Sequence, residues 1–303
     1  MNVRVIHPPG QSDPHDRPAE AMIQKLFSRI SEISSLPEVA LQIMELANDP
    51  ETETGQLLEA VRGDPALAMR LMRTVNSSYY ALTEKVADLK QAITLLGFKE
   101  VCNLALTSYV ANMFKETVGY GEYTRRGLWN HSVGVGLVAR LLARTCGKVT
   151  PQEVYLAGLL HDLGLILLDQ YLHKPFCRVL DTVTEDTPLC EVERRLLGFD
   201  HALLGEFVAA QWKLPPQLAT AIGHHHAPQE YEGPYCETVY IVALANFFCH
   251  LKHLTALGVR QVQTPPVELF TGLGLAKEQF SSIVDQLDEV LVAADVMALV
   301  QVR

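Results

Sequence analysis

The residues best suited to do chemistry are histidines and one aspartate in the second half of the chain. One histidine and the aspartate are adjacent, and successive members of the set are otherwise separated by 30, 39 and 24 residues, up to a final histidine pair. The set comprises His131, His161, Asp162, His201, His225 and His226. Imidazole and carboxylate groups that project from facing helices can form a metal centre. This mixture favours Fe, Mn, Zn or Ni, and its lack of thiolates argues against iron–sulfur clusters and Cu(I).

His161 and Asp162 lie in LAGLLHDLGLILL, an otherwise apolar run over residues 156–168. A buried imidazole beside a buried carboxylate is costly unless each group finds a partner. That partner could be a metal ion, a phosphate chemistry or only other side chains, and the run alone leaves these alternatives open. A histidine taken singly is more often a hydrogen-bonded structural residue than a ligand. The whole pattern is more specific than any one of its members.

The composition limits the classes of protein to which this chain could belong. Its 303 residues are 48% hydrophobic and carry a formal charge of −10. Because no basic segment stands out, we expect no nucleic-acid partner. Because no stretch reaches 18 consecutive apolar residues, we expect no membrane span. The six cysteines form no C-x-x-C pair, so we expect reduced thiols in a cytoplasmic protein.

Helical spacing of apolar residues runs through most of the chain and predicts an all-α fold. The Pro-, Asp- and Gly-rich segment 1–20 is expected to be a flexible tail. An N-terminal helical lobe is predicted over 21–120, a second helical lobe over 121–254 and a C-terminal helical extension over 255–303. Strand-like alternation is limited to a weak signal at 259–263.

Two local signals concern the helices that carry the candidate residues. The sequence TPQE, residues 150–153, predicts a capping box with proline at the first helical position. It would begin the helix that leads to His161 and Asp162. The glycines in VGVG, residues 133–136, follow His131 on one predicted helix and favour close packing of a second helix.

The remaining basic side chains of interest are expected at the surface. Residues without a recognisable motif are most often solvated when they are charged. Those expected there are Arg125, Arg126, Arg140, Lys213, His173, His224, His250 and His253.

Long motifs connect the chain with a known family. Trp129-x-His131, HDLG at 161–164 and His225-His226 resemble the HD superfamily of metal-dependent phosphohydrolases. Four longer stretches resemble the HDOD domain, an HD-related output domain of bacterial signalling proteins. They are LPEVALQIMELANDPETE (36–53), VRGDPALAMRLMRTVNSSYY (61–80), LKQAITLLGFKEVCNLAL (89–106) and GFDHALLGEFVAAQW (198–212). The resemblance covers roughly residues 25–250 and implies an all-helical, HD-type fold preceded by a helical lobe.

The resemblance also implies two sets of metal ligands. In HD hydrolases His131, His161 and Asp162 would bind one metal ion, and a later aspartate would complete that site. This chain has Asn246 at the corresponding position. In the cyclic-dinucleotide phosphodiesterase branch, Asp162 would bridge to a second ion. The further ligands of that ion would be His201, His225 and His226.

Several departures weaken the resemblance to a catalytic member of that branch. Leu165 stands where the branch has a lysine, Ala227 replaces a glutamate, and the Gly-Tyr-Pro motif is altered at 233–235. The candidate ligands contain only one carboxylate, so a single metal ion is easier to accommodate than two.

Two functions remain open from the sequence. The first is a regulatory or protein-binding module of bacterial signal transduction that retains a metal in a degenerate HD-type site, with another signalling protein as its partner. The second is a metal-dependent phosphohydrolase that acts on nucleotides or cyclic dinucleotides. Fold alone does not decide between them, because function depends on the site.

Overall fold

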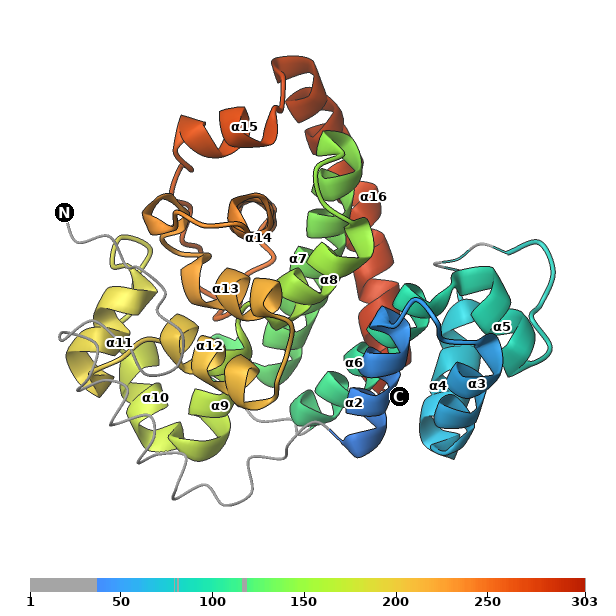
Figure 1. Cartoon of the computed structure of the whole chain (residues 1–303). Helices are drawn as coiled ribbons and strands as arrows, with labels where there is room; N and C mark the ends of the chain where they lie inside the picture. Colours follow the sequence, from blue (N-terminus) through green and yellow to red (C-terminus); the bar gives the residue numbers. More distant parts are fainter. Residues whose placement is uncertain (1–36, 79, 81, 116–118, 303) are drawn as a thin grey trace.

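The computed structural model describes residues 37–78, 80, 82–115 and 119–302 (Figure 1). The expected tail over 1–20 and the start of the predicted N-terminal lobe lie outside these residues. Helices dominate the described chain, which confirms the all-α fold class. Among the described helices, none has both the length and the apolar character needed to cross a membrane.

The N-terminal lobe consists of short helices grouped around α6. Its elements are α2 (Glu38–Asn48), α3 (Thr54–Arg62), α4 (Pro65–Val75), α5 (Leu89–Leu96), α6 (Phe98–Ala111) and the 3₁₀ helix η1 (Asn112–Phe114). The carboxylate of Asp64 caps α4 by accepting the N–H of Leu67 at 3.0 Å, and Pro65 occupies the first helical position. Gly97 separates α5 from α6 with a φ of +78°, a conformation that favours glycine.

A small hairpin leads into the second lobe. Its strands are β1 (Gly119–Tyr120) and β2 (Tyr123–Thr124), which pair antiparallel. The helical elements that follow are α7 (Arg125–Cys146), α8 (Pro151–Leu160), α9 (Leu163–Tyr171), α10 (His173–Leu180), α11 (Leu189–Leu197), α12 (His201–Gln211), α13 (Pro216–His224), η2 (Pro228–Glu230) and α14 (Cys236–Leu251). In Figure 1 the N-terminal lobe, blue to teal, lies on one side of α7 and α8, and α9 to α12 lie on the other.

The C-terminal part contains α15 (Val267–Leu273) and α16 (Lys277–Val302). The weak strand signal at 259–263 was wrong, because this segment has no paired neighbour among the described residues and leads into Pro265 and Pro266. The long helix α16 packs along α7 and reaches the N-terminal lobe at α4 and α6 (Figure 1). The indole N–H of Trp129 on α7 donates to the carbonyl of Ala298 at 3.3 Å.

A buried ion pair joins the two lobes. The Arg140 guanidinium on α7 donates to both carboxylate oxygens of Glu100 on α6, each at 3.0 Å. The same guanidinium lies over the Tyr155 ring of α8, 4.4 Å from its centroid. The expectation of a solvated Arg140 was therefore wrong.

Arg125 is likewise buried, and its guanidinium pairs with the Asp169 carboxylate at 2.5 Å. The surface expectation failed for both arginines because α7 runs through the centre of the molecule, so its charged residues need internal partners. Arg126 and Lys213 are exposed, as expected.

The predicted capping box at the start of α8 is absent. Thr150 makes no side-chain capping bond. Its backbone carbonyl instead accepts the N–H groups of Glu153 and Val154. The Glu153 carboxylate is drawn away to Lys99 of α6, at 2.8 Å. A contact between the lobes thus replaces the local cap.

Candidate metal centre

Asp162 lies at the centre of the histidine cluster. Helix α8 ends at Leu160, and Asp162 stands immediately before α9, so its carboxylate projects from the bend between two helices. One oxygen, Oδ2, lies 3.2 Å from Nε2 of His161 and 3.5 Å from Nε2 of His131. We refer to His131 and His161 as the first histidine group.

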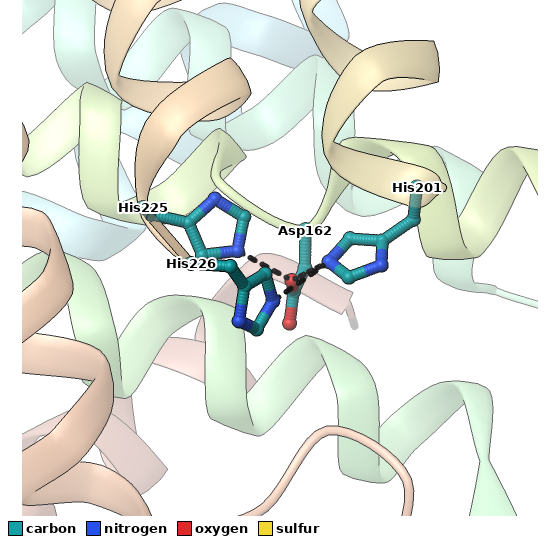
Figure 2. A group of neighbouring side chains, drawn as sticks. All are labelled: Asp162, His201, His225 and His226. Atoms are coloured by element: carbon teal, nitrogen blue, oxygen red, sulfur yellow. Dashed lines mark hydrogen bonds and ion pairs between the residues drawn. The ribbon is translucent and has the colours of Figure 1, made fainter. Parts of the chain in front are cut away.

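The other oxygen of Asp162 faces a different set of rings (Figure 2). Oδ1 lies 3.3 Å from Nε2 of His201 and 3.5 Å from Nε2 of His225. Nε2 of His226 lies 3.0 Å from Nε2 of His201. His201, His225 and His226 form the second histidine group. The structure therefore brings all six candidate residues together and divides them between the two oxygens of one carboxylate.

Hydrogen bonds from the opposite ring nitrogen orient most of these imidazoles. Nδ1 of His131 lies 2.8 Å from the carbonyl oxygen of Leu254. Nδ1 of His161 lies 2.7 Å from the carbonyl oxygen of Gly158, and Nδ1 of His225 lies 2.8 Å from that of Ile222. A carbonyl only accepts, so each Nδ1 carries the hydrogen and each Nε2 presents its lone pair to Asp162. Fixing the tautomer from the far side of the ring is the usual support for a metal-binding histidine.

The inward-facing nitrogens have no ordinary partner. Nε2 of His131, His161 and His225 and Oδ1 of Asn246 are buried without a hydrogen bond among the described residues. Lone pairs aimed at a carboxylate gain nothing from it, and burying such atoms unsatisfied is costly. A cation would satisfy all of them at once, so this nitrogen and oxygen donor set fits a divalent transition metal.

The electrostatics keep several of these rings neutral. Burial, reinforced by neighbouring histidines, lowers the pKa of His131 to about 3. Burial also lowers the pKa of His225 to about 4. Burial alone would raise the pKa of Asp162, but the surrounding histidines, His161 foremost, outweigh burial and hold it well below its usual range. At neutral pH His131 and His225 are therefore neutral and Asp162 is ionised, the forms in which these groups bind metal.

Glu193 on α11 is a functional candidate that the sequence analysis missed. Its fully buried carboxylate accepts from the backbone N–H of His201 at 3.0 Å and lies 2.7 Å from Nδ1 of the same ring. Burial would lower the pKa of His201, but Glu193 and Asp162 raise it well above its usual value. Glu193 thus adds a second negative charge next to the centre, which the count of one carboxylate omitted. The acidic residue eight positions before His201 was visible in the sequence, but it belongs to no motif that the sequence analysis considered.

Glycines allow the helices of the site to approach closely. A Cβ on Gly164, in the HDLG motif, would lie 1.9 Å from the carbonyl oxygen of His201, so this position requires glycine for α9 to meet α12. A Cβ on Gly158 of α8 would lie 2.9 Å from the backbone of Gly136 on α7. The close packing expected for the VGVG glycines is confirmed there.

Helix α14 adds Asn246 and His250 to the site. Both residues, together with Asp162 and His226, line a small recess inside the cluster. The His250 ring stands edge-on to the His131 ring, with centroids 5.2 Å apart. The expected surface position of His250 was wrong, because α14 turns this face towards the centre.

The other histidines expected at the surface differ in their exposure. His224 is 3% exposed, so that prediction was wrong. His173 and His253 are exposed, as expected.

A cavity of about 700 Å³ opens onto the second histidine group. His225 and His226 form part of its inner wall, and Asn246 and His250 form another part. Arg194 also lines the cavity, and its guanidinium pairs with the Asp200 carboxylate at 2.6 Å. The cavity gives a small ligand access to one side of the centre.

Comparisons with known proteins agree with this architecture. The family model for the HDOD domain matches residues 33–228. A solved HDOD domain protein with unknown function from Geobacter sulfurreducens is 26% identical, with a TM-score of 0.80 over 91% of this chain and 97% of that one. A protein from Marinobacter aquaeolei VT8, provisionally assigned to signal transduction, is 24% identical, with a TM-score of 0.78 over 96% of this chain and 67% of that one.

A curated relative from Treponema pallidum (strain Nichols) is an uncharacterized protein, 27% identical over 73% of this chain. The match covers 43% of that protein, so the chain spans less than half of its length.

Proposed function

This chain belongs to the HDOD domain family, and we propose that it is a bacterial signal-transduction module that binds divalent transition metal around Asp162. The observation that carries the proposal is the division of one carboxylate between two histidine groups. Each oxygen faces its own set of Nε2 atoms, as a bridging ligand between two ions would. Fe, Mn, Zn and Ni suit this donor set.

We infer positions for two ions rather than one. The first would be held by the first histidine group and Oδ2 of Asp162, with the buried Oδ1 of Asn246 as a neutral addition. The second would be held by the second histidine group and Oδ1. Sequence reasoning favoured one ion because it counted one carboxylate. The Glu193 carboxylate pairs with Nδ1 of His201, and its negative charge supports a cation at the second position.

A regulatory role accounts for the departures from a catalytic pattern. Leu165, at the position of a lysine in the phosphodiesterase branch, is fully buried and supplies no cation to a phosphate. Bound metal would instead hold α7, α9, α12 and α13 in one arrangement, and so present a fixed surface to a signalling protein. The provisional assignment of the Marinobacter protein to signal transduction supports this reading.

The cavity favours a second candidate function, a metal-dependent phosphohydrolase. A bound ion would lower the pKa of a water molecule and polarise a phosphoryl oxygen. In this chain, the hydrogen bonds at Nδ1 would fix the imidazole rings, and the substrate would reach the centre through the cavity that His226 lines. A cavity of about 700 Å³ has room for a nucleotide or part of a cyclic dinucleotide.

One experiment separates these functions. The protein is purified without a nickel column, its metals are quantified, and turnover of phosphodiesters and phosphomonoesters is measured with added Mn²⁺ or Fe²⁺. His161→Ala and Asp162→Ala remove ligands, and His253→Ala changes an exposed histidine as the control.

Stoichiometric metal without turnover, lost in both ligand variants and kept in the control, would support the signalling module. Metal-dependent turnover that both ligand variants abolish would refute a purely regulatory role and establish the hydrolase. Absence of metal in the wild type, even after incubation with each candidate ion, would refute both.

A further inference from the structure

His250 occupies the rim between the cluster and the cavity. It lies one helical turn after Asn246 on α14, and both side chains line the cavity as well as the recess beside Asp162. Its ring is in edge contact with the His131 ring. His250 is nevertheless outside the groups of side chains whose ligand atoms converge within 4.8 Å among the described residues. It is therefore placed to touch what the metal holds rather than the metal itself.

The C-terminal segment fixes the orientation of the His250 ring. The backbone N–H of Gln261 donates to Nδ1 of His250 at 3.4 Å. The Gln261 side-chain amide donates to the carbonyls of Thr184 and Thr187 at 2.8 and 2.6 Å, which ties the segment to a neighbouring turn. Because Nδ1 accepts, the hydrogen of the neutral ring is on Nε2.

The orientation of the His250 ring makes it a hydrogen-bond donor at the rim. Because Nδ1 accepts the N–H of Gln261, Nε2 carries the ring hydrogen and can donate it to an anionic oxygen. Asn246 cannot perform this role through its buried Oδ1, which only accepts.

We propose that His250 is a binding residue whose Nε2–H donates to an oxygen of a tetrahedral oxyanion of the phosphate class held at the metal centre. The inference rests on the proposed function, because the oxyanion needs the bound cation. It also assigns a role to the segment that follows α14, which lies beyond the family match at 33–228. Leu254 in this segment holds His131, and Gln261 holds His250.

The test measures inorganic phosphate binding to the zinc-loaded full chain by calorimetry, after the zinc content has been determined. His250→Phe keeps an aromatic ring without the donor, and His250→Gln restores an N–H. His253→Gln, at an exposed histidine, is the matched control. We expect His250→Phe to weaken phosphate binding roughly 10- to 100-fold at unchanged zinc content, because a hydrogen bond to a charged group is lost. His250→Gln should recover part of the affinity, and the control should match the wild type.

A second readout does not depend on the variants. In ¹⁵N spectra of the zinc-loaded wild type, His250 should appear as the Nε2–H tautomer, and its Nε2 signal should move when phosphate is added. This inference alone would be overturned if the zinc-loaded wild type did not bind phosphate, or if His250→Phe bound phosphate with wild-type affinity. A wild type that takes up no zinc or other candidate metal would overturn the proposed function and this inference with it.

Discussion

At the scale of single residues, the candidate ligands depend on the side chains that orient them. The Glu193 carboxylate lies 2.7 Å from Nδ1 of His201, on the side of the ring opposite to Nε2, and Nε2 faces Asp162 at 3.3 Å. A buried charge of this kind orients the ring and makes it a stronger ligand.

Glu193 provides a prediction at this scale. Glu193→Gln keeps a hydrogen-bond acceptor for His201 but removes the charge, so metal affinity at the second histidine group should fall about 10- to 100-fold. The affinity at the first histidine group should change much less. Competition titration against a chromogenic chelator measures both. Glu185→Gln, at an exposed position, serves as the control. Equal weakening of both positions, or of neither, would show that Glu193 does not support the second histidine group.

The ligand candidates could be predicted from the sequence, because polar residues in apolar helices need partners. The groups that support them could not. Glu193 was not considered and His250 was expected at the surface, because their roles come from contacts between helices, α11 with α12 and α14 with α7. Such contacts leave no period in the sequence. The Nε2 atoms without a hydrogen bond, which are the strongest sign of a metal, could be identified only in the structure.

At the scale of elements, apolar periodicity predicted the helices well, because most of them bury one face. Local capping signals failed where a tertiary contact competed with them. Glu153 pairs with Lys99 and does not form the expected capping box. The HDLG glycine was recognised as part of a motif, but its purpose became clear only from the approach of α12.

Gly164→Ala tests that approach. The added methyl would overlap the His201 carbonyl, so α9 and α12 must separate, at a cost of about 1–3 kcal/mol in the free energy of unfolding. Displacement of His201 should also weaken metal binding at the second histidine group. Gly55→Ala on α3, where a Cβ meets nothing within 4 Å, should be neutral or stabilising. Urea unfolding and metal titration measure the effects. Unchanged stability in Gly164→Ala would contradict the close crossing.

At the scale of the whole molecule, the division into two lobes and an extension stays a prediction, and the sequence contained no sign of how these parts contact one another. Arg140 looked like a surface residue because nothing near it in sequence reveals its partner, Glu100, 40 positions earlier. The extension over 255–303 also contacts both lobes and the site. Helix α16 packs on α7 and reaches the N-terminal lobe, and the backbone N–H of Gln261 donates to His250.

The buried pair between the lobes should contribute strongly to stability. Glu100→Gln leaves the Arg140 charge buried without its counter-charge and should cost about 3–5 kcal/mol in the free energy of unfolding. Adding Arg140→Met should recover much of that loss. Glu153→Gln breaks the more exposed pair with Lys99 and should cost less than about 1 kcal/mol. Chemical denaturation compares these variants. Similar losses in Glu100→Gln and Glu153→Gln would show that the buried pair has no special role.

Acid should destabilise the metal-free protein. His131, His225 and His250 have folded-state pKa values of about 3, 4 and 4, below the value near 6.5 expected when unfolded. The unfolded chain therefore binds more protons as the pH falls from about 6.5 towards 4, and each group lowers stability by about 1.4 kcal/mol per pH unit there. His201, with its raised pKa, opposes this by losing its contribution as the pH rises through the folded value.

Three groups outweigh one, so the denaturation midpoint of the metal-free protein should be lower at pH 4.5 than at pH 7. A midpoint that rises on acidification would mean that these rings are charged in the folded state, and so unsuited to bind metal.

We propose that Asp162 holds one metal ion on each side. Anomalous diffraction from zinc-loaded crystals would locate these ions. Two peaks are expected to flank the Asp162 carboxylate, one beside His131 and His161 and one beside His201 and His225, each about 2.0–2.2 Å from its ligand atoms. A single peak would reduce the claim to one site. Zinc bound elsewhere, with both histidine groups empty, would contradict it.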